Sequence, residues 1–114
     1  MKKLLRRLRG AFKVTTGKDD IVDYLSEDPP SCVVFGGPKE AFTDVECETI
    51  KEYVNKGGSA LFLLHEGGER SNDTNCNTVL RDMGISCNDD SVMRQVYYKY
   101  LHPKEVFIAE GVLV

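Results

Sequence analysis

Two kinds of segment alternate along this chain: short, continuous apolar runs, and stretches in which apolar residues recur at helical spacing. Residues 32–35 (CVVF) and 60–64 (ALFLL) are continuous apolar runs, and each is followed by a turn that contains two glycines. Runs of this kind are typical of strands buried on both faces, as in the centre of a parallel sheet. Residues 85–87 and 106–109 are two further, shorter candidates for strands.

In the segments between these strands, apolar residues recur at helical spacing. Thr43 and Glu46 form a capping box, which predicts a helix that begins there and ends at Gly57-Gly58. A second helix is expected between a cap at Asp73 and a stop at Gly84. The buried stripes of these two helices are expected to consist of Cys47, Ile50, Tyr53 and Val54, and of Cys76, Val79, Leu80 and Met83. Shorter helices are expected over 2–9 and after Asp20, where Pro29-Pro30 stops the second one.

This order of strands and helices predicts the fold class. Strand, helix, strand, helix and strand in succession are typical of βαβ crossovers. We expect an α/β domain with an open, mostly parallel sheet and helices on both faces. A chain of 114 residues is too short for two independent cores, so a single domain is predicted.

The charges are divided unevenly between the N-terminal segment and the rest. Residues 1–18 carry seven of the 15 basic side chains and no acidic one, which leaves residues 19–114 with eight basic and 18 acidic side chains and a net charge of −10. The basic segment has three interpretations: an amphipathic helix that covers the sheet, a contact with a membrane or an acidic partner, or a mitochondrial transit segment. No apolar run is long enough to cross a bilayer.

The turns after the two long strands are the positions where an open parallel sheet binds ligands. They contain Gly36 and Gly37 after the first strand, and Glu66, Gly67, Gly68 and Glu69 after the second. The glycines would let a backbone approach a phosphate, but neither turn has a complete phosphate-binding motif, and the two glutamates would repel an anion. We therefore favour turn geometry over phosphate binding.

The strand, turn and helix around His65 have the outline of a nucleophile elbow, but no Ser or Cys stands at the turn. His65 with Glu66, Glu69 and Asp73 would be a candidate cation site, although Glu69 and Asp73 fit better as negative charges for the helix that follows. The four cysteines have no CxxC spacing and are expected to be reduced, buried hydrophobic side chains. We predict no catalytic residue, no metal site and no cofactor.

The densest cluster of aromatic and basic side chains lies near the C-terminal end. It comprises Arg94, Tyr97, Tyr98, Lys99, Tyr100, His102 and Lys104. Packed tyrosines and a surface for protein contact are equally good explanations. A nucleic-acid surface is disfavoured, because the acidic remainder of the chain would repel phosphates.

The motif Val96-Tyr97-Tyr98-Lys99-Tyr100, continued by His102-Pro103-Lys104-Glu105, resembles the intraflagellar transport 52 family. Further matches are Gly37-Pro38, Phe42-Thr43, Gly57-Gly58, Glu66 to Glu69, Asp73 to Asn75 and Gly111 to Leu113. Members of this family are subunits of the intraflagellar transport B complex of cilia and flagella.

The resemblance implies a fold similar to class I glutamine amidotransferases and to flavodoxin, without catalytic residues. It implies a structural subunit that binds other subunits of the B complex, located in the cilium or flagellum, the basal body and the cytoplasm. It also implies that residues 1–114 are one partial domain, since the family has a further strand before the segment matching Lys3–Arg9. The alternative is a small-molecule-binding or hydrolytic α/β domain that uses the glycine-containing turns.

Overall fold

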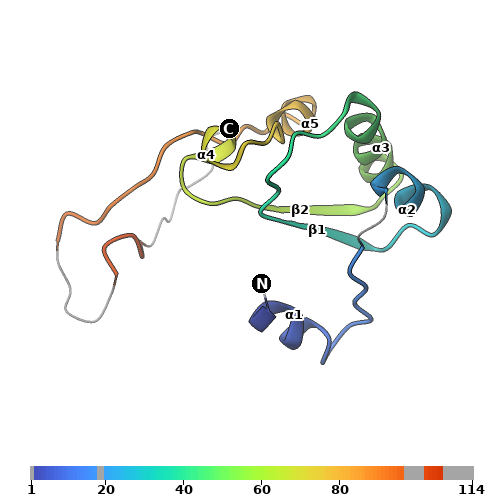
Figure 1. Cartoon of the computed structure of the whole chain (residues 1–114), viewed down its shortest axis with the longest axis horizontal. Coiled ribbons are helices and arrows are strands. Elements are labelled where there is room, and N and C mark those ends of the chain that lie inside the picture. The colour runs from blue at the N-terminus through green and yellow to red at the C-terminus, as the bar shows by residue number, and fades with distance from the viewer. Residues whose placement is uncertain (1, 18–19, 97–101, 107–114) are drawn as a thin grey trace.

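The computed structural model describes residues 2–17, 20–96 and 102–106 (Figure 1). The elements follow in the order α1 (Lys2–Leu8), α2 (Ile21–Glu27), β1 (Cys32–Gly36), α3 (Asp44–Asn55), β2 (Ser59–Leu63), α4 (Gly68–Asn72) and α5 (Asn77–Asp82). The two long strands and the helix between them therefore lie where the apolar pattern predicts them. None of the helices in these ranges is long and apolar enough to cross a membrane.

β1 and β2 form a parallel pair, connected by α3 as a crossover helix. Cys32 lies opposite Ser59 and Gly36 opposite Leu63, so the two strands are paired over their whole lengths. The parallel arrangement expected from the sequence is confirmed, with a sheet of two strands in the described ranges. Residues 85–87, which we expected to form a third strand, are irregular. Of the fourth expected strand, 106–109, residues 107–109 lie outside the described residues.

One face of the strand pair is covered and the other is exposed. Val33, Phe35 and Phe62 pack against the core cluster of α2, α3 and α5. The side chains of Val34 and Leu61, which lie opposite each other in the register, are 39% and 49% exposed. Successive side chains of a strand point to opposite faces, so helices on one side bury only every second residue. In the described part of the chain the two strands are therefore covered on one face, and their burial on the other face stays a prediction.

The core gathers around α3. Ile50 is fully buried, and it packs with Cys47 and Tyr53 of the same helix, Leu25 of α2 and Val79 of α5. The rings of Phe35 and Phe62 stack with centroids 4.6 Å apart, and Phe42 meets Phe35 edge to face at 5.5 Å. This aromatic cluster connects the strand pair to the start of α3.

Both ends of α3 are fixed by the residues that predicted them. The Thr43 hydroxyl accepts a hydrogen bond from the Glu46 amide, and the Glu46 carboxylate accepts one from the Thr43 amide, at 3.3 and 2.7 Å. At the other end the Gly57 and Gly58 amides donate to the carbonyls of Val54 and Tyr53, and Gly57 has a φ of 98°. A β-carbon at Gly58 would lie 2.3 Å from the Tyr53 ring, so only glycine fits this close approach.

The helix expected between Asp73 and Gly84 is shorter than predicted, and a further short helix, α4, precedes Asp73. The sequence did not predict α4, and Asp73 ends this helix in a left-handed conformation with a φ of 51°. α5 begins later, after Cys76, and ends at Asp82, and Gly84 follows it in a left-handed conformation with a φ of 76°. The prediction of Asp73 as the N-cap is therefore wrong, because the chain uses this residue to turn between two short helices.

Candidate functional site

The two glycine-containing turns meet at the carboxyl ends of β1 and β2. The Gly37 amide donates a hydrogen bond of 2.8 Å to the Leu63 carbonyl, which extends the strand pairing into the turns. The imidazole of His65 lies against Gly37, since its Nε2 is 3.4 Å from the place of a β-carbon there. Gly37 has a φ of 73°, so glycine suits both the backbone and the ring beside it.

The two glutamates of the second turn are engaged by the protein itself. Both carboxylate oxygens of Glu66 accept hydrogen bonds from the Lys104 ammonium. The carboxylate of Glu69 accepts one from the amide of Asn77, the first residue of α5. Glu69 thus serves the following helix, as the sequence suggested. Asp73 does not act as the cap of that helix.

Residues 88–90 close over the second turn. The Gly67 amide donates to the Asp90 carbonyl at 3.1 Å, and the Arg70 amide donates to the Asp89 carboxylate at 3.5 Å. A β-carbon at Gly68 would lie 2.4 Å from the Asn88 carbonyl oxygen. The glycines therefore let the backbone of the chain itself approach closely, which is the contact that a ligand would otherwise make.

A buried asparagine attaches this segment to α5. The Asn77 side chain accepts a hydrogen bond from the Cys87 amide at 2.8 Å and donates one to the Cys87 carbonyl at 2.9 Å. Asn75 makes the same two-way contact with the backbone of Phe42, at 2.7 and 2.9 Å. The amide groups of the two asparagines thus replace the backbone partners that a neighbouring strand would supply.

The cysteines do not supply a nucleophile to the turn. Cys76 is fully buried, and burial together with the nearby Glu69 carboxylate raises the pKa of its thiol to about 11. Burial also raises the pKa of Cys47. Since the thiolate is the reactive form, both thiols are unreactive near neutral pH. Cys32 is exposed and Cys87 is partly exposed, so the expectation of four buried cysteines is wrong for these two.

Three of the seven residues predicted to form an interaction surface are described. The Arg94 amide donates to the Pro103 carbonyl at 2.9 Å, and the Arg94 guanidinium donates to the Glu105 carbonyl. The Lys104 amide donates to Nδ1 of His102 at 3.2 Å. Arg94 and Lys104 therefore bring the two ends of the motif together and join it to Glu66. Tyr97, Tyr98, Lys99 and Tyr100 lie outside the described residues.

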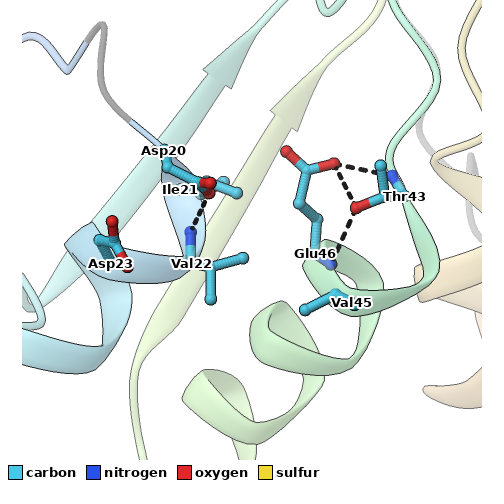
Figure 2. A pocket seen from close by; sticks show the side chains of 7 residues that line it. All are labelled: Asp20, Ile21, Val22, Asp23, Thr43, Val45 and Glu46. Atoms are coloured by element: carbon cyan, nitrogen blue, oxygen red, sulfur yellow. Dashed lines mark hydrogen bonds between the residues drawn. The ribbon is translucent and has the colours of Figure 1, made fainter.

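A shallow depression of about 560 Å³ lies between the N-terminal ends of α2 and α3 (Figure 2). Asp20, Asp23 and Glu46 line it. The Asp20 carboxylate accepts from the Val22 amide at 3.0 Å, and Glu46 takes part in the capping box. Two of the three carboxylates are thus helix caps. Across the described ranges, His, Cys, Asp and Glu side chains form no group of three that would hold a metal ion.

Contacts between distant residues were missed by sequence reasoning at this site. The pairing of Glu66 with Lys104 spans 38 positions, and no local pattern signals it. The presence of Asn75 and Asn77 in a helix-forming segment is the one signal that was available, because asparagine favours hydrogen bonds to backbone outside helices.

These features define an α/β domain with a parallel strand pair, in which the turns at the strand ends are filled by the chain itself. The family model described as the IFT52 GIFT domain matches residues 1–114. The chain belongs to the intraflagellar transport 52 family, which confirms the resemblance in the sequence.

Individual relatives agree with the family match. Intraflagellar transport protein 52 homologs of Mus musculus and Homo sapiens are 44% and 40% identical over 112 residues, which are 98% of this chain and 26% and 25% of the relatives. The chain thus spans about a quarter of the length of these relatives. A solved structure, the mmIFT52 N-terminal domain, superposes with a TM-score of 0.83 at 44% identity, covering 99% of this chain and 50% of the other.

Proposed function

We propose that this chain is the N-terminal, non-enzymatic part of a structural subunit of the intraflagellar transport B particle. In this role it supports the assembly and maintenance of cilia or flagella and transport along them. The observation that carries the proposal is the family match over residues 1–114. The expected locations are the cilium or flagellum, the basal body and the cytoplasm.

The contacts at the strand ends favour a structural role over chemistry. The segment from the end of β2 into the first turn of α4, residues 64–69, holds His65, two glutamates and two glycines, without a Ser or Cys. Glu66 and Glu69 bind groups of the chain itself, and residues 88–90 lie against the glycines. No observation favours the alternative, a small-molecule-binding or hydrolytic domain.

The finer fold that we propose is an open, mostly parallel sheet with helices on both faces, similar to amidotransferases and flavodoxin. The exposed apolar side chains of Val34 and Leu61 support it, because a bare apolar sheet face is suited to burial under a further layer. Residues 1–114 are then one part of a larger domain, as the 50% coverage of the solved relative suggests.

The surface that we propose for contact with other B-complex subunits is the motif Arg94, Tyr97, Tyr98, Lys99, Tyr100, His102 and Lys104. Tyrosine and arginine are enriched where protein interfaces bind strongly. Arg94 and Lys104 support this role indirectly, since Arg94 holds the ends of the motif together and Lys104 joins the motif to Glu66. Nucleic acid is not an expected partner.

The test is co-purification from ciliated or flagellated cells of the source organism. The tagged protein is expressed as wild type, as the pair Tyr98→Ala and Tyr100→Ala, and as a control pair, Val45→Ala and Ile85→Ala, which removes other exposed apolar side chains. We expect wild type and control to recover B-complex subunits, and the tyrosine variant to lose them. Failure of the wild type overturns the function, whereas full recovery by the tyrosine variant overturns only the proposed surface.

A further inference from the structure

The segment that carries the proposed contact surface is attached at both of its described ends to the turn between β2 and α4. At the outgoing end, residues 88–90 lie against this turn, where the Gly67 amide donates a hydrogen bond to the Asp90 carbonyl at 3.1 Å. At the returning end, the Lys104 ammonium donates to both carboxylate oxygens of Glu66. The turn therefore holds the segment where it leaves the fold and where it comes back.

The same two ends are also bonded to each other. The Arg94 amide donates to the Pro103 carbonyl at 2.9 Å, and the Arg94 guanidinium donates to the Glu105 carbonyl. A surface segment whose ends are held close together is a compact loop of the kind that often carries function. Figure 1 shows its described parts, residues 91–96 and 102–106 in orange and red, to one side of α2 and α3. The fold thus presents this loop apart from its core helices.

One ion pair places the returning end of the loop. Within the described ranges, the pair of Glu66 and Lys104 is the one hydrogen-bonded or ionic contact between residues 102–106 and residues 20–90. Further hydrogen bonds of this stretch join it to Arg94 or lie within it, as where the Lys104 amide donates to Nδ1 of His102 at 3.2 Å. These bonds shape the returning end, whereas Glu66 fixes where it lies relative to the strands.

We propose that Glu66 is a positioning residue for the contact of this loop with a protein partner, a role that rests on the proposed function of the motif. Holding a loop in its bound arrangement raises affinity, because less conformational entropy is lost on binding. A pair of half-exposed side chains is strong enough to change the affinity by up to about fivefold. The strand-end turn, where an open parallel sheet commonly binds ligands, here supports a surface for another protein.

The charges around the turn restrict the kind of partner that fits. Since both oxygens of the Glu66 carboxylate bind the Lys104 ammonium, this cation is already neutralised by the chain itself. The charged side chains of residues 66–70, 88–96 and 102–106 are five acids and three bases: Glu66, Glu69, Asp89, Asp90 and Glu105 against Arg70, Arg94 and Lys104. An acidic partner would be repelled by this excess of negative charge. The partner expected here is a neutral or basic protein surface.

The test is recovery of B-complex subunits from ciliated or flagellated cells of the source organism, over a dilution series of the tagged 114-residue chain. Two variants break the pair by reversing one charge each, Glu66→Lys and Lys104→Glu. A third variant carries both changes and rebuilds the pair with the charges exchanged. The matched controls reverse two other exposed charges, Lys39→Glu and Glu40→Lys. The thermal unfolding midpoint of each variant checks that the fold is kept.

We expect each single reversal to raise the concentration of tagged chain needed for half recovery by about fivefold. The double variant is expected to return to within about twofold of the wild type, because the exchanged charges attract each other again. The controls should match the wild type. All midpoints should stay close to that of the wild type, since a pair of this kind contributes little to stability. Loss of binding with an intact fold separates positioning from a general structural role.

The outcomes distinguish this role from the function on which it rests. Undiminished recovery by both single variants overturns the positioning role of Glu66 and leaves the proposed function in place. A double variant as weak as the single ones also overturns it, and assigns Lys104 to direct contact with an acidic group of the partner. Failure of the wild type to recover B-complex subunits overturns the proposed function, and the role of Glu66 with it.

Discussion

The connection from β1 to β2 and the segment that follows β2 are held together in different ways. In the first, residues 37–58, α3 is fixed by its own caps and by a central position in the core. In the second, residues 64–90, side chains join the two short helices to residues 87–89 and to the backbone of Phe42. A region built from local signals can be predicted from the sequence, whereas one built from distant contacts requires the structure.

Asn77→Ala should have the largest effect among the three substitutions that test this difference. It removes both hydrogen bonds to the Cys87 backbone and leaves an amide and a carbonyl without their partner, at a cost of about 1–3 kcal/mol in the free energy of unfolding. The free energy of unfolding is measured by denaturant unfolding. Thr78→Ala, at the exposed neighbouring position, is the control and should stay within about 0.5 kcal/mol of wild type. Equal stabilities of the two variants would show that distant contacts do not hold this segment.

Thr43→Ala should have an intermediate effect on the region built from local signals. It removes the hydroxyl that accepts from the Glu46 amide, and the loss of such a cap costs about 1 kcal/mol. The control is Thr49→Ala, which removes the same group within α3, where alanine is the better helix former. In equilibrium unfolding, Thr43→Ala should have a lower free energy of unfolding than Thr49→Ala. The reverse order would contradict the importance of the cap.

Lys104→Ala should have the smallest effect. It breaks the ion pair with Glu66, but both side chains are about half exposed, and pairs of this kind contribute only about 0–1 kcal/mol. The hydrogen-exchange rates of the amides of residues 66–70 should rise slightly. The control, Lys39→Ala, should leave these rates unchanged. A loss of several kcal/mol would mean that this one contact, rather than residues 88–90, closes the turn.

The same comparison explains which parts of the fold could be predicted from the sequence. The capping box, the apolar stripe and the two glycines lie next to one another in the sequence, and together they predicted α3 to within one or two residues. The expected cap at Asp73 and the strand at 85–87 were wrong, because Asn77 binds Cys87 across ten positions and Asp73 turns the chain. The meeting of the turns was expected from parallel strands, but their closure by residues 88–90 was not.

The turns at the strand ends are filled by the chain itself, and we predict that they bind no small ligand. The most direct test is thermal unfolding of the chain with nucleotides, sugars and glutamine in turn, alongside an assay for ammonia released from glutamine. We expect an unchanged midpoint and no ammonia. A ligand present at one hundred times its dissociation constant would add about 2.7 kcal/mol, which raises the midpoint of a domain this size by roughly 10 °C. Such a shift, or release of ammonia, would show that the chain binds a small ligand and would contradict this prediction.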